Sequence, residues 1–183
     1  MKFMIASDIH GSAYYCRHLL DRHTAEAPER LILLGDILYH GPRNTIPKGY
    51  DTKEVIGMPN PLSDHILCIH GNCDSEVDQL VLDFRLIEDH TLLQICNYTV
   101  FLTHGHRYNR DTLPPELLPG DILLYGHSHV PIHDDCGGIL CINPGSVSIP
   151  REDSPHSYMI WEDNVLSWKH LDGTVYDRII LPG

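Results

Sequence analysis

Five short clusters of acidic, amide or imidazole side chains each stand directly after a run of apolar residues, and this pattern constrains the fold most. The clusters are Asp8-Ile9-His10-Gly11, Gly35-Asp36, Gly71-Asn72-Cys73-Asp74, Thr103-His104-Gly105-His106 and Gly126-His127-Ser128-His129. Apolar runs of about four to eight residues bounded by Gly, Asp and Asn are typical of buried strands. Ligands bind at the carboxyl edge of open α/β sheets, so we expect the five clusters to converge at such an edge.

The apolar runs predict strands along the whole chain. They lie at 3–6, 31–34, 66–69, 91–96, 99–102, 122–125, 139–142, 158–161, 165–168 and 178–181. The first half alternates strands with helical segments, whereas the second half is nearly all strand with connections of hairpin length. This order predicts two packed sheets with helices outside them, in a single domain over residues 1–183.

Three segments predict helices. Residues 12–22 follow the first strand, with Ser12 as a plausible N-cap. Residues 75–84 place apolar side chains at helical spacing, which is typical of an amphipathic helix. A short helix near 51–57 is expected between the second and third strands, because two prolines that follow it would break a longer one.

Composition excludes several classes of protein. The chain has 25 acidic and 13 basic residues and a formal net charge of −12, which argues against non-specific binding to duplex nucleic acid. No segment approaches the ~20 apolar residues needed to cross a bilayer, so we expect no membrane span. The six cysteines follow no disulfide framework. Reduced thiols, and hence a cytoplasmic location, are the expectation.

The clusters carry the donor types of a metal site. Asp8 and His10 stand two residues apart at a strand end, which projects both side chains to one side. The two oxygens of the Asp36 carboxylate can bridge two cations, and Asn72 supplies a neutral oxygen. Each cluster alone is common turn chemistry, but five of them at strand ends are not. This oxygen and imidazole set suits Mn, Fe, Zn or Ni rather than Ca alone.

The clusters also carry a resemblance. In order, Asp8-x-His10, Gly35-Asp36, Gly71-Asn72, His104 and Gly126-His127-x-His129 match the motifs of calcineurin-like metallophosphoesterases. Residues 40–44 (HGPRN), 71–76 (GNCDSE) and 143–148 (NPGSVS) look like the small bacterial YfcE-type phosphodiesterases. The resemblance runs from Lys2 to about Pro150. It implies a four-layer αββα sandwich with a binuclear metal centre at the strand ends.

The resemblance also implies roles for individual residues. One metal would be held by Asp8, His10, Asp36 and His129, and the other by Asp36, Asn72, His104 and His127. Catalysis would rest on Asp8, His10, Asp36, Asn72 and His104. Mn is the metal implied for similar proteins, with Ni, Zn or Fe as alternatives. Two such cations clamp the phosphoryl oxygens and lower the pKa of a water, so that hydroxide attacks phosphorus in line.

Three residues are candidates for the proton donor to the leaving group. Many members of the superfamily have histidine after the motif asparagine, whereas this chain has Cys73. A thiol with an ordinary pKa of ~8.5 matches neutral pH less well than imidazole does. His106 and His70 are nearby candidates for this role. We therefore expect the rate to depend steeply on the leaving group.

Three further residues are candidates around the centre. Asp74 can orient a metal-ligating histidine, or it can be the N-terminal carboxylate of the following helix. Arg43 and Asn44 are candidates for contacting a substrate phosphate, with a plain exposed turn as the alternative.

The most plausible function is a metal-dependent phosphodiesterase, a phosphoric diester hydrolase that acts on a small phosphodiester. A phosphomonoesterase or nucleotide phosphatase would use the same metals. A non-enzymatic scaffold of the same fold is less consistent with the full set of ligand positions, and a nuclease would need a basic stripe that the sequence lacks. The sequence leaves a homo-oligomer open.

Overall fold

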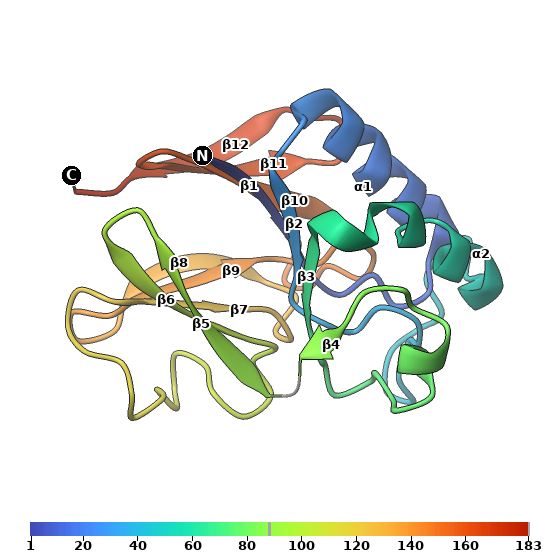
Figure 1. Cartoon of the computed structure of the whole chain (residues 1–183), viewed down its shortest axis with the longest axis horizontal. Helices are drawn as coiled ribbons and strands as arrows, with labels where there is room; N and C mark the ends of the chain where they lie inside the picture. Colours follow the sequence, from blue (N-terminus) through green and yellow to red (C-terminus); the bar gives the residue numbers. More distant parts are fainter. Residues whose placement is uncertain (88, 183) are drawn as a thin grey trace.

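Two β-sheets stacked face to face form the frame of the molecule (Figure 1). A computed structural model describes residues 1–87 and 89–182. The seven-stranded sheet has the order β12 (Val175–Ile180), β11 (Val165–His170), β10 (Ser157–Glu162), β1 (Lys2–Ala6), β2 (Arg30–Leu33), β3 (Ile66–Ile69) and β4 (Leu86–Ile87). The five-stranded sheet has the order β5 (His90–Ile95), β6 (Tyr98–Thr103), β7 (Ile122–Tyr125), β9 (Leu140–Pro144) and β8 (Pro131–Asp135).

Strand directions bring the polar clusters to one edge. Strands β1, β2, β3 and β4 are parallel, as are β6, β7 and β9. Ile5 pairs with Ile32 in the first sheet, and Val100 pairs with Ile122 in the second. Because parallel neighbours end at the same edge, residues that follow β1, β2 and β3, or β6 and β7, lie close together.

Alternation along the strands divides the core into layers. In β1, Phe3 and Ile5 face the second sheet, where they join a buried cluster with Val100 and Ile122. Met4 and Ala6, on the other face of the same strand, belong to a cluster shared with the helices. This period of two is what a strand buried on both faces requires.

Helices cover the outer face of the seven-stranded sheet (Figure 1). Helix α1 (Ala13–Glu26) begins at the predicted cap, since the hydroxyl of Ser12 accepts a hydrogen bond from the Tyr15 amide at 3.2 Å. Helix α2 (Thr52–Gly57) is the short helix that the sequence predicts. The turn η1 (Asn60–His65) follows it. No helix in the described parts of the chain is long and apolar enough to span a bilayer.

The predicted helix over 75–84 is wrong. The structure has only one 3₁₀ turn there, η2 (Asp78–Leu80), and the side chains of Val77 and Leu80 are 64% and 82% exposed. Hydrogen bonds between a polar side chain and the backbone keep this segment from continuing as a helix. The Gln79 amide bonds to backbone groups of three residues further along, at 2.7–3.2 Å. These bonds replace those that a continuing helix would make.

The outer face of the five-stranded sheet is covered differently from what the resemblance implies. Phe101, Leu123 and Tyr125 pack there against Leu117 in a third buried cluster. The covering segment, 105–120, is fully described and contains no helix. The prediction of a hairpin-length connection is wrong at this position. Strands β6 and β7 are parallel, so they need a long crossover between them. The expected two-sheet α/β fold is otherwise confirmed.

A partly buried carboxylate ties α1 to the sheet and gives a test of stability. Glu26, at the end of α1, accepts hydrogen bonds from Lys169 and from the Tyr158 hydroxyl, and pairs with Lys2 at 3.1 Å. Partial burial raises the pKa of Glu26, but the contacts with Lys169 and Lys2 outweigh it and lower the pKa. We expect Glu26→Gln to lower the free energy of unfolding by about 1–2 kcal/mol at pH 7 in urea denaturation.

The pH dependence of this penalty follows from its sign. A depressed carboxyl pKa stabilises the fold above the unfolded-state value of about 4.3, and the contribution disappears as the pH falls through the folded-state value. The difference between the variant and the wild type should therefore begin to shrink as the pH falls below about 4.3 and should vanish below the lowered folded-state pKa. Glu54→Gln, which removes an exposed pair with Arg17, serves as the control and should cost less than about 0.5 kcal/mol. An equal loss in both variants, or no convergence in acid, would contradict this assignment.

Candidate metal centre

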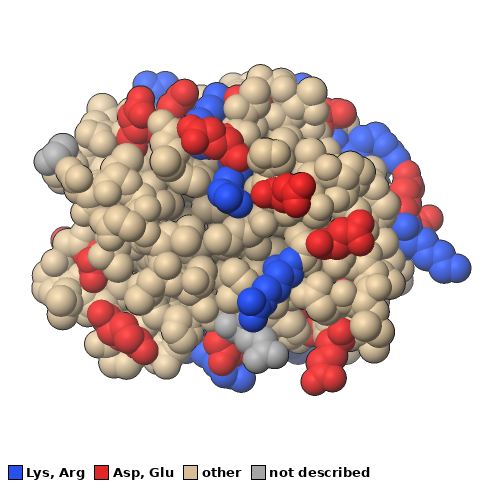
Figure 2. Space-filling model, in the orientation of Figure 1, with Lys and Arg blue, Asp and Glu red and all other residues tan. Residues whose placement is uncertain are grey.

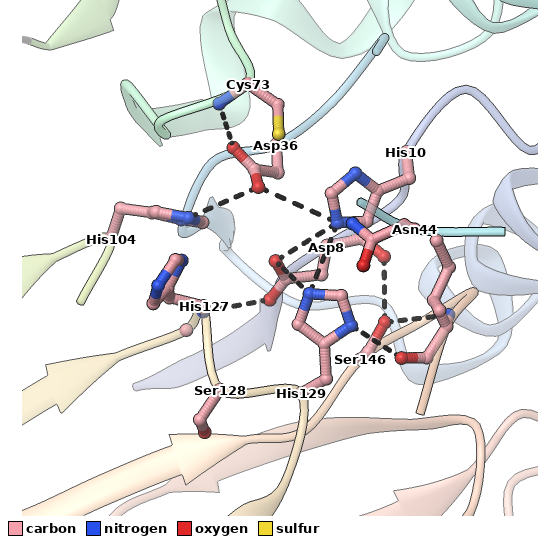
Figure 3. Close-up of polar contacts among 12 residues, drawn as sticks. Asp8, His10, Asp36, Asn44, Cys73, His104, His127, Ser128, His129 and Ser146 are labelled. Atoms are coloured by element: carbon pink, nitrogen blue, oxygen red, sulfur yellow. Dashed lines mark hydrogen bonds and ion pairs between the residues drawn. The ribbon is translucent and has the colours of Figure 1, made fainter. Parts of the chain in front are cut away.

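Seven potential metal-donor side chains meet where strands of both sheets end. Asp8 and His10 follow β1, Asp36 follows β2, Asn72 follows β3, His104 follows β6, and His127 and His129 follow β7. The side chains of Asp8, His10, Asp36, His104 and His129 point toward one another (Figure 3). The structure therefore brings together the polar clusters that the sequence singles out.

The backbone at these positions is held in an unusual conformation. Asp8, His10, Asp36, His127 and His129 all have positive φ angles, between 50° and 64°. This region disfavours residues other than glycine, and such strain is found chiefly where a site requires it. Hydrogen bonds between the two strand ends hold it in place, for example from the His10 amide to the Asp36 carbonyl at 2.8 Å.

Three imidazoles are oriented by backbone carbonyls. The bonds are His10 Nδ1 to Tyr39 O at 2.8 Å, His104 Nδ1 to Leu34 O at 2.6 Å, and His129 Nδ1 to Ile149 O at 2.5 Å. A carbonyl only accepts hydrogen bonds, so each Nδ1 must carry a proton. In the neutral ring this leaves the Nε2 lone pair directed into the centre, as in histidines that ligate metals.

The atoms that face the centre fit a cation. Asp8 Oδ1 is buried and, within residues 1–87 and 89–182, accepts no hydrogen bond. It lies 3.5 Å from His10 Nε2 and 3.3 Å from His129 Nε2, and these two nitrogens are 3.3 Å apart. Two lone pairs and a carboxylate oxygen repel one another unless a proton or a metal ion lies between them. The donor set therefore fits a metal ion.

Asp36 lies between His10 of this first group and a second group of donors. Asp36 Oδ2 lies 3.6 Å from His10 Nε2 and 3.3 Å from His104 Nε2. The Asn72 side-chain oxygen is 3.0 Å from His104 Nε2. Donor atoms of Asp8, His10 and His129 lie within 4.8 Å of one another, and so do those of Asp8, Asp36 and His104. Asp36 thus stands where a bridging carboxylate would stand.

Histidine protonation reflects the negative charge of the centre. Burial lowers the pKa of His104, but its contact with Asp36 and the charges of Asp36 and Asp8 raise it to about 9. His127 differs: burial and the nearby His104 lower its pKa to about 4. The His127 ring packs edge-on to His104 with the centroids 5.1 Å apart. In the compact donor groups above it takes no part, so its predicted role as a ligand requires the ring to turn inward.

Asp74 braces the loop that carries Asp36. Its carboxylate accepts from the amides of Asp36 and Ile37, both at 2.7 Å, and from Gly71 at 2.8 Å. Backbone amides occupy both oxygens, so Asp74 orients Asp36 rather than a histidine. The alternative role at the start of a helix also fails, because the helix over 75–84 does not form. Asp74 instead fixes the distance between the ends of β2 and β3.

Two glycines allow these strand ends to approach. A Cβ at Gly71 would lie 2.2 Å from Asp36 Oδ1, and one at Gly35 would lie 2.6 Å from the Gly71 nitrogen. Gly35 also has a φ of +98°. Because side chains of other residues cannot fit here, the pairs Gly35-Asp36 and Gly71-Asn72 each need their glycine for close backbone contact.

Residues 143–148 hold the backbone of Asp8 in place through side-chain hydrogen bonds. The hydroxyls of Ser146 and Ser148 both donate to the Asp8 carbonyl at 3.0 Å. The Asn143 amide group donates to the Gly126 carbonyl at 2.6 Å. These bonds fix the ends of β1 and β7 relative to each other, so the motif shapes the site without lining it.

A cavity of about 700 Å³ opens beside the donors and is lined by Asp36, Asn72, Cys73, His127 and His129. Cys73 donates its amide to Asp36 Oδ1 at 2.8 Å, and its thiol lies with His10 and Asp36 in a further group of close donor atoms. Burial, followed by the charge of Asp36, raises the pKa of the thiol to about 12. The thiol is therefore protonated when no metal is bound.

His106 and His70 are the other candidate proton donors. The His106 ring is 5.6 Å from His104 and 6.2 Å from His127, centroid to centroid. Its Nδ1 is buried and, in the described chain, without a hydrogen-bond partner. His70 directly follows β3, and neither it nor His106 is among the residues that line the cavity. His106, unlike His70, has ring contacts with His104 and His127. Of the two histidines, His106 is the better placed.

The same cavity is lined by Arg43, Asn44 and Arg151. Asn44 already uses both ends of its amide, because its Nδ2 donates to the His40 carbonyl and its Oδ1 accepts from Arg151, each at 2.8 Å. Its predicted contact with substrate therefore stays a prediction. Sequence reasoning missed Arg151, whose one signal is its place shortly after the 143–148 motif.

Comparisons with known proteins agree with this geometry. The model of the calcineurin-like phosphoesterase superfamily domain matches residues 1–164. Phosphodiesterase YfcE of Escherichia coli strain K12 is 41% identical over 167 residues, which cover 91% of this chain and 90% of the relative. A solved structure described as Yfce, a phosphoesterase from E. coli, superposes with a TM-score of 0.95 and 39% identity over 100% of both chains.

A more distant structure shares the fold alone. Wild-type Vps29 of Entamoeba histolytica, described as complexed with zinc, has a TM-score of 0.63 and 23% identity. The match covers 98% of this chain and 99% of that one.

Proposed function

Because this chain belongs to the calcineurin-like phosphoesterase superfamily, we propose that it is a metal-dependent phosphodiesterase acting on a small phosphodiester. One observation of the structure carries the proposal. Three imidazoles held by backbone carbonyls and two buried aspartates present their donor atoms to one centre. In that centre lies the buried Asp8 Oδ1, which accepts no hydrogen bond from any described part of the chain. Such a set is suited to cations and not to a hydrophobic core.

Two divalent cations would complete this centre, with Mn proposed first and Ni, Zn or Fe as alternatives. Asp8, His10, Asp36 and His129 would hold one, and Asp36, Asn72, His104 and His127 the other. When bound, the pair supplies Lewis-acid activation of the phosphoryl group and of the attacking water. The chain's own part is to fix the donors before the substrate arrives, through the carbonyl, Asp74 and Ser146 contacts described above.

A small substrate fits the rest of the molecule. The cavity of about 700 Å³ is of the size that holds a nucleotide-sized molecule. On the face shown in Figure 2, basic residues are scattered among acidic ones and form no continuous stripe. We therefore propose a small-molecule substrate rather than duplex nucleic acid. The six cysteines, all free in the described chain, support a reducing cytoplasmic setting.

The test is an assay of chelator-stripped protein against bis(p-nitrophenyl) phosphate and p-nitrophenyl phosphate, with Mn, Ni, Zn or Mg added in turn. Recovery of diester hydrolysis by Mn, at a rate above that for the monoester, is the expected result. Faster hydrolysis of the monoester would favour a phosphomonoesterase instead. Tight metal uptake without turnover of either compound would overturn the proposal in favour of a non-enzymatic scaffold.

Cys73 at the position of a common histidine predicts a strong leaving-group effect. A positioned general acid contributes about 10²–10⁴-fold to a rate, and a thiol is poorly matched to this role at neutral pH. In a series of aryl methyl phosphates, we expect kcat to fall at least about 100-fold from p-nitrophenol to phenol as leaving group. A flat dependence would show that another group, such as His106, donates the proton.

A further inference from the structure

Two arginines, Arg43 and Arg151, line the cavity. Within the described chain, neither Arg43 nor Arg151 forms an ion pair, although the protein has 25 acidic residues and 13 basic ones. Arg17 pairs with Glu54 and Arg110 with Asp134, whereas Arg22, Arg30, Arg85 and Arg178 also form no ion pair in the described chain. What distinguishes Arg43 and Arg151 is that they line the cavity beside the metal-donor side chains. In so acidic a chain, unpaired guanidinium groups beside a cavity are free to bind an anion.

Arg151 is also held in place. Its Nη2 donates to the side-chain oxygen of Asn44 at 2.8 Å, and Asn44 is fixed in turn by the His40 carbonyl. The Arg151 amide donates to the carbonyl of His129 at 3.2 Å, which ties its backbone to a proposed metal ligand. A guanidinium group has five N–H donors, so most of them remain available after the bond to Asn44. Because these contacts already fix Arg151, less side-chain entropy is lost when an anion binds.

Arg43 and Arg151 place two positive charges on the wall of a cavity that also contains the proposed metal centre. A phosphodiester carries one negative charge, and the proposed cations would hold it at the scissile phosphate. The two guanidinium groups can therefore bind a further anionic group of the same substrate. Their two positive charges match the dianion of a phosphate monoester.

We propose that Arg151, positioned by Asn44 and assisted by Arg43, binds a second phosphate on the substrate. The substrate class is then a phosphodiester in which one ester arm carries a terminal phosphate monoester. This inference rests on the proposed phosphodiesterase function and narrows it. Asn44 acts here as a positioning residue, which accounts for the engagement of both ends of its amide.

A pair of substrates separates this proposal from the general function. Thymidine 5′-(p-nitrophenyl phosphate) and the same compound with a 3′-phosphate share the scissile bond and the leaving group, and differ in one dianionic group. A hydrogen bond to a charged group contributes a factor of about 10 to 100. The Mn-loaded wild-type protein should therefore favour the 3′-phosphorylated compound by about 10-fold or more in kcat/KM, mainly through a lower KM.

Variants test whether Arg151 is responsible for the preference for the 3′-phosphorylated compound. Arg151→Gln should lower kcat/KM about 10-fold more for the 3′-phosphorylated compound than for the compound without this phosphate, and so remove most of the preference. Asn44→Asp should have the same effect, because the new carboxylate pairs with Arg151. Arg110→Gln is the matched control and should keep the preference, since Arg110 is paired with Asp134 and lines a neighbouring cavity. An equal loss for both substrates in Arg151→Gln would place Arg151 on the scissile phosphate and overturn the proposal.

Binding provides a readout that does not depend on turnover. In calorimetric titrations of the Mn-loaded protein, thymidine 3′,5′-bisphosphate should bind at least about 10-fold more tightly than thymidine 5′-monophosphate. Arg151→Gln should abolish the difference, and Arg151→Lys should restore part of it. Equal binding of the two compounds by the wild type would overturn the proposal. Persisting hydrolysis of bis(p-nitrophenyl) phosphate would show that the phosphodiesterase function itself stands.

Discussion

Asp36→Asn should reduce the turnover of bis(p-nitrophenyl) phosphate by about 10³-fold or more, because the Asp36 carboxylate faces His10 on one side of the centre and His104 on the other. Asparagine keeps the shape of the side chain and can still accept from the Cys73 amide, which bonds to Asp36 at 2.8 Å. It removes the negative charge, however, and it offers one oxygen in place of two. If the remaining oxygen keeps the bond to the Cys73 amide, the NH₂ group replaces Oδ2, the oxygen that faces both His10 and His104 and is placed to bridge two cations.

Metal content distinguishes this effect from unfolding. We expect the Mn bound per chain, measured by plasma emission spectroscopy after dialysis, to fall from about two to one or fewer in Asp36→Asn. The melting temperature in the presence of chelator should stay close to that of the wild type. Asp64→Asn, at an exposed carboxylate, is the control and should retain both activity and metal. A variant that binds two Mn ions and turns over normally would remove Asp36 from the proposed bridge.

The strand ends could be predicted from the sequence because their signals are local. An apolar run followed by Gly35-Asp36 or by Gly126-His127 marks both the end of a buried strand and the start of a loop. Parallel pairing then places these ends at one edge without further information. The short helix α2 is another local signal, since Asp51 caps it and accepts from the Glu54 amide at 3.0 Å.

Elements that depend on tertiary contacts were missed or wrong. The apolar spacing in 75–84 is helical, but Gln79 bonds to the backbone beyond it and Leu80 is left exposed. The sequence did not predict strand β8, because His133, Asp134 and Asp135 are exposed and polar, as an edge strand allows. Hydrophobic periodicity measures burial, so it fails where a segment is stabilised by side-chain hydrogen bonds or lies at an edge.

The support of the site was also beyond local reasoning. Backbone carbonyls orient His104 and His129, and any residue type can supply a carbonyl, so Leu34 and Ile149 carry no signal. Arg151 reaches Asn44 across 107 positions of the chain. The donors of the candidate site could thus be chosen from side-chain chemistry, whereas the groups that hold them and the cationic side of the cavity required the three-dimensional structure.

Asp74→Asn should be the most destabilising conservative change near the site. Asp74 is 7% exposed, and its Oδ2 accepts from Asp36 and Gly71 while its Oδ1 accepts from Ile37. Asparagine can keep the first two bonds, but its NH₂ group would then face the Ile37 amide, donor against donor. An unsatisfied buried donor costs about 1–3 kcal/mol, and the lost charge weakens the two remaining bonds. We expect a loss of about 2–4 kcal/mol in the free energy of unfolding.

Urea denaturation of the chelated protein measures this loss without any contribution from metal. The control is Asp78→Asn, because Asp78 Oδ2 accepts a single bond, from the Ser75 amide at 2.9 Å, near the surface. That change should cost no more than about 1 kcal/mol. Because Asp74 fixes the loop of Asp36, the Asp74→Asn protein that remains folded should also bind Mn more weakly by about 10–100-fold, as expected for groups that orient metal ligands. Wild-type stability together with wild-type Mn affinity would show that Asp74 neither braces the strand ends nor positions Asp36.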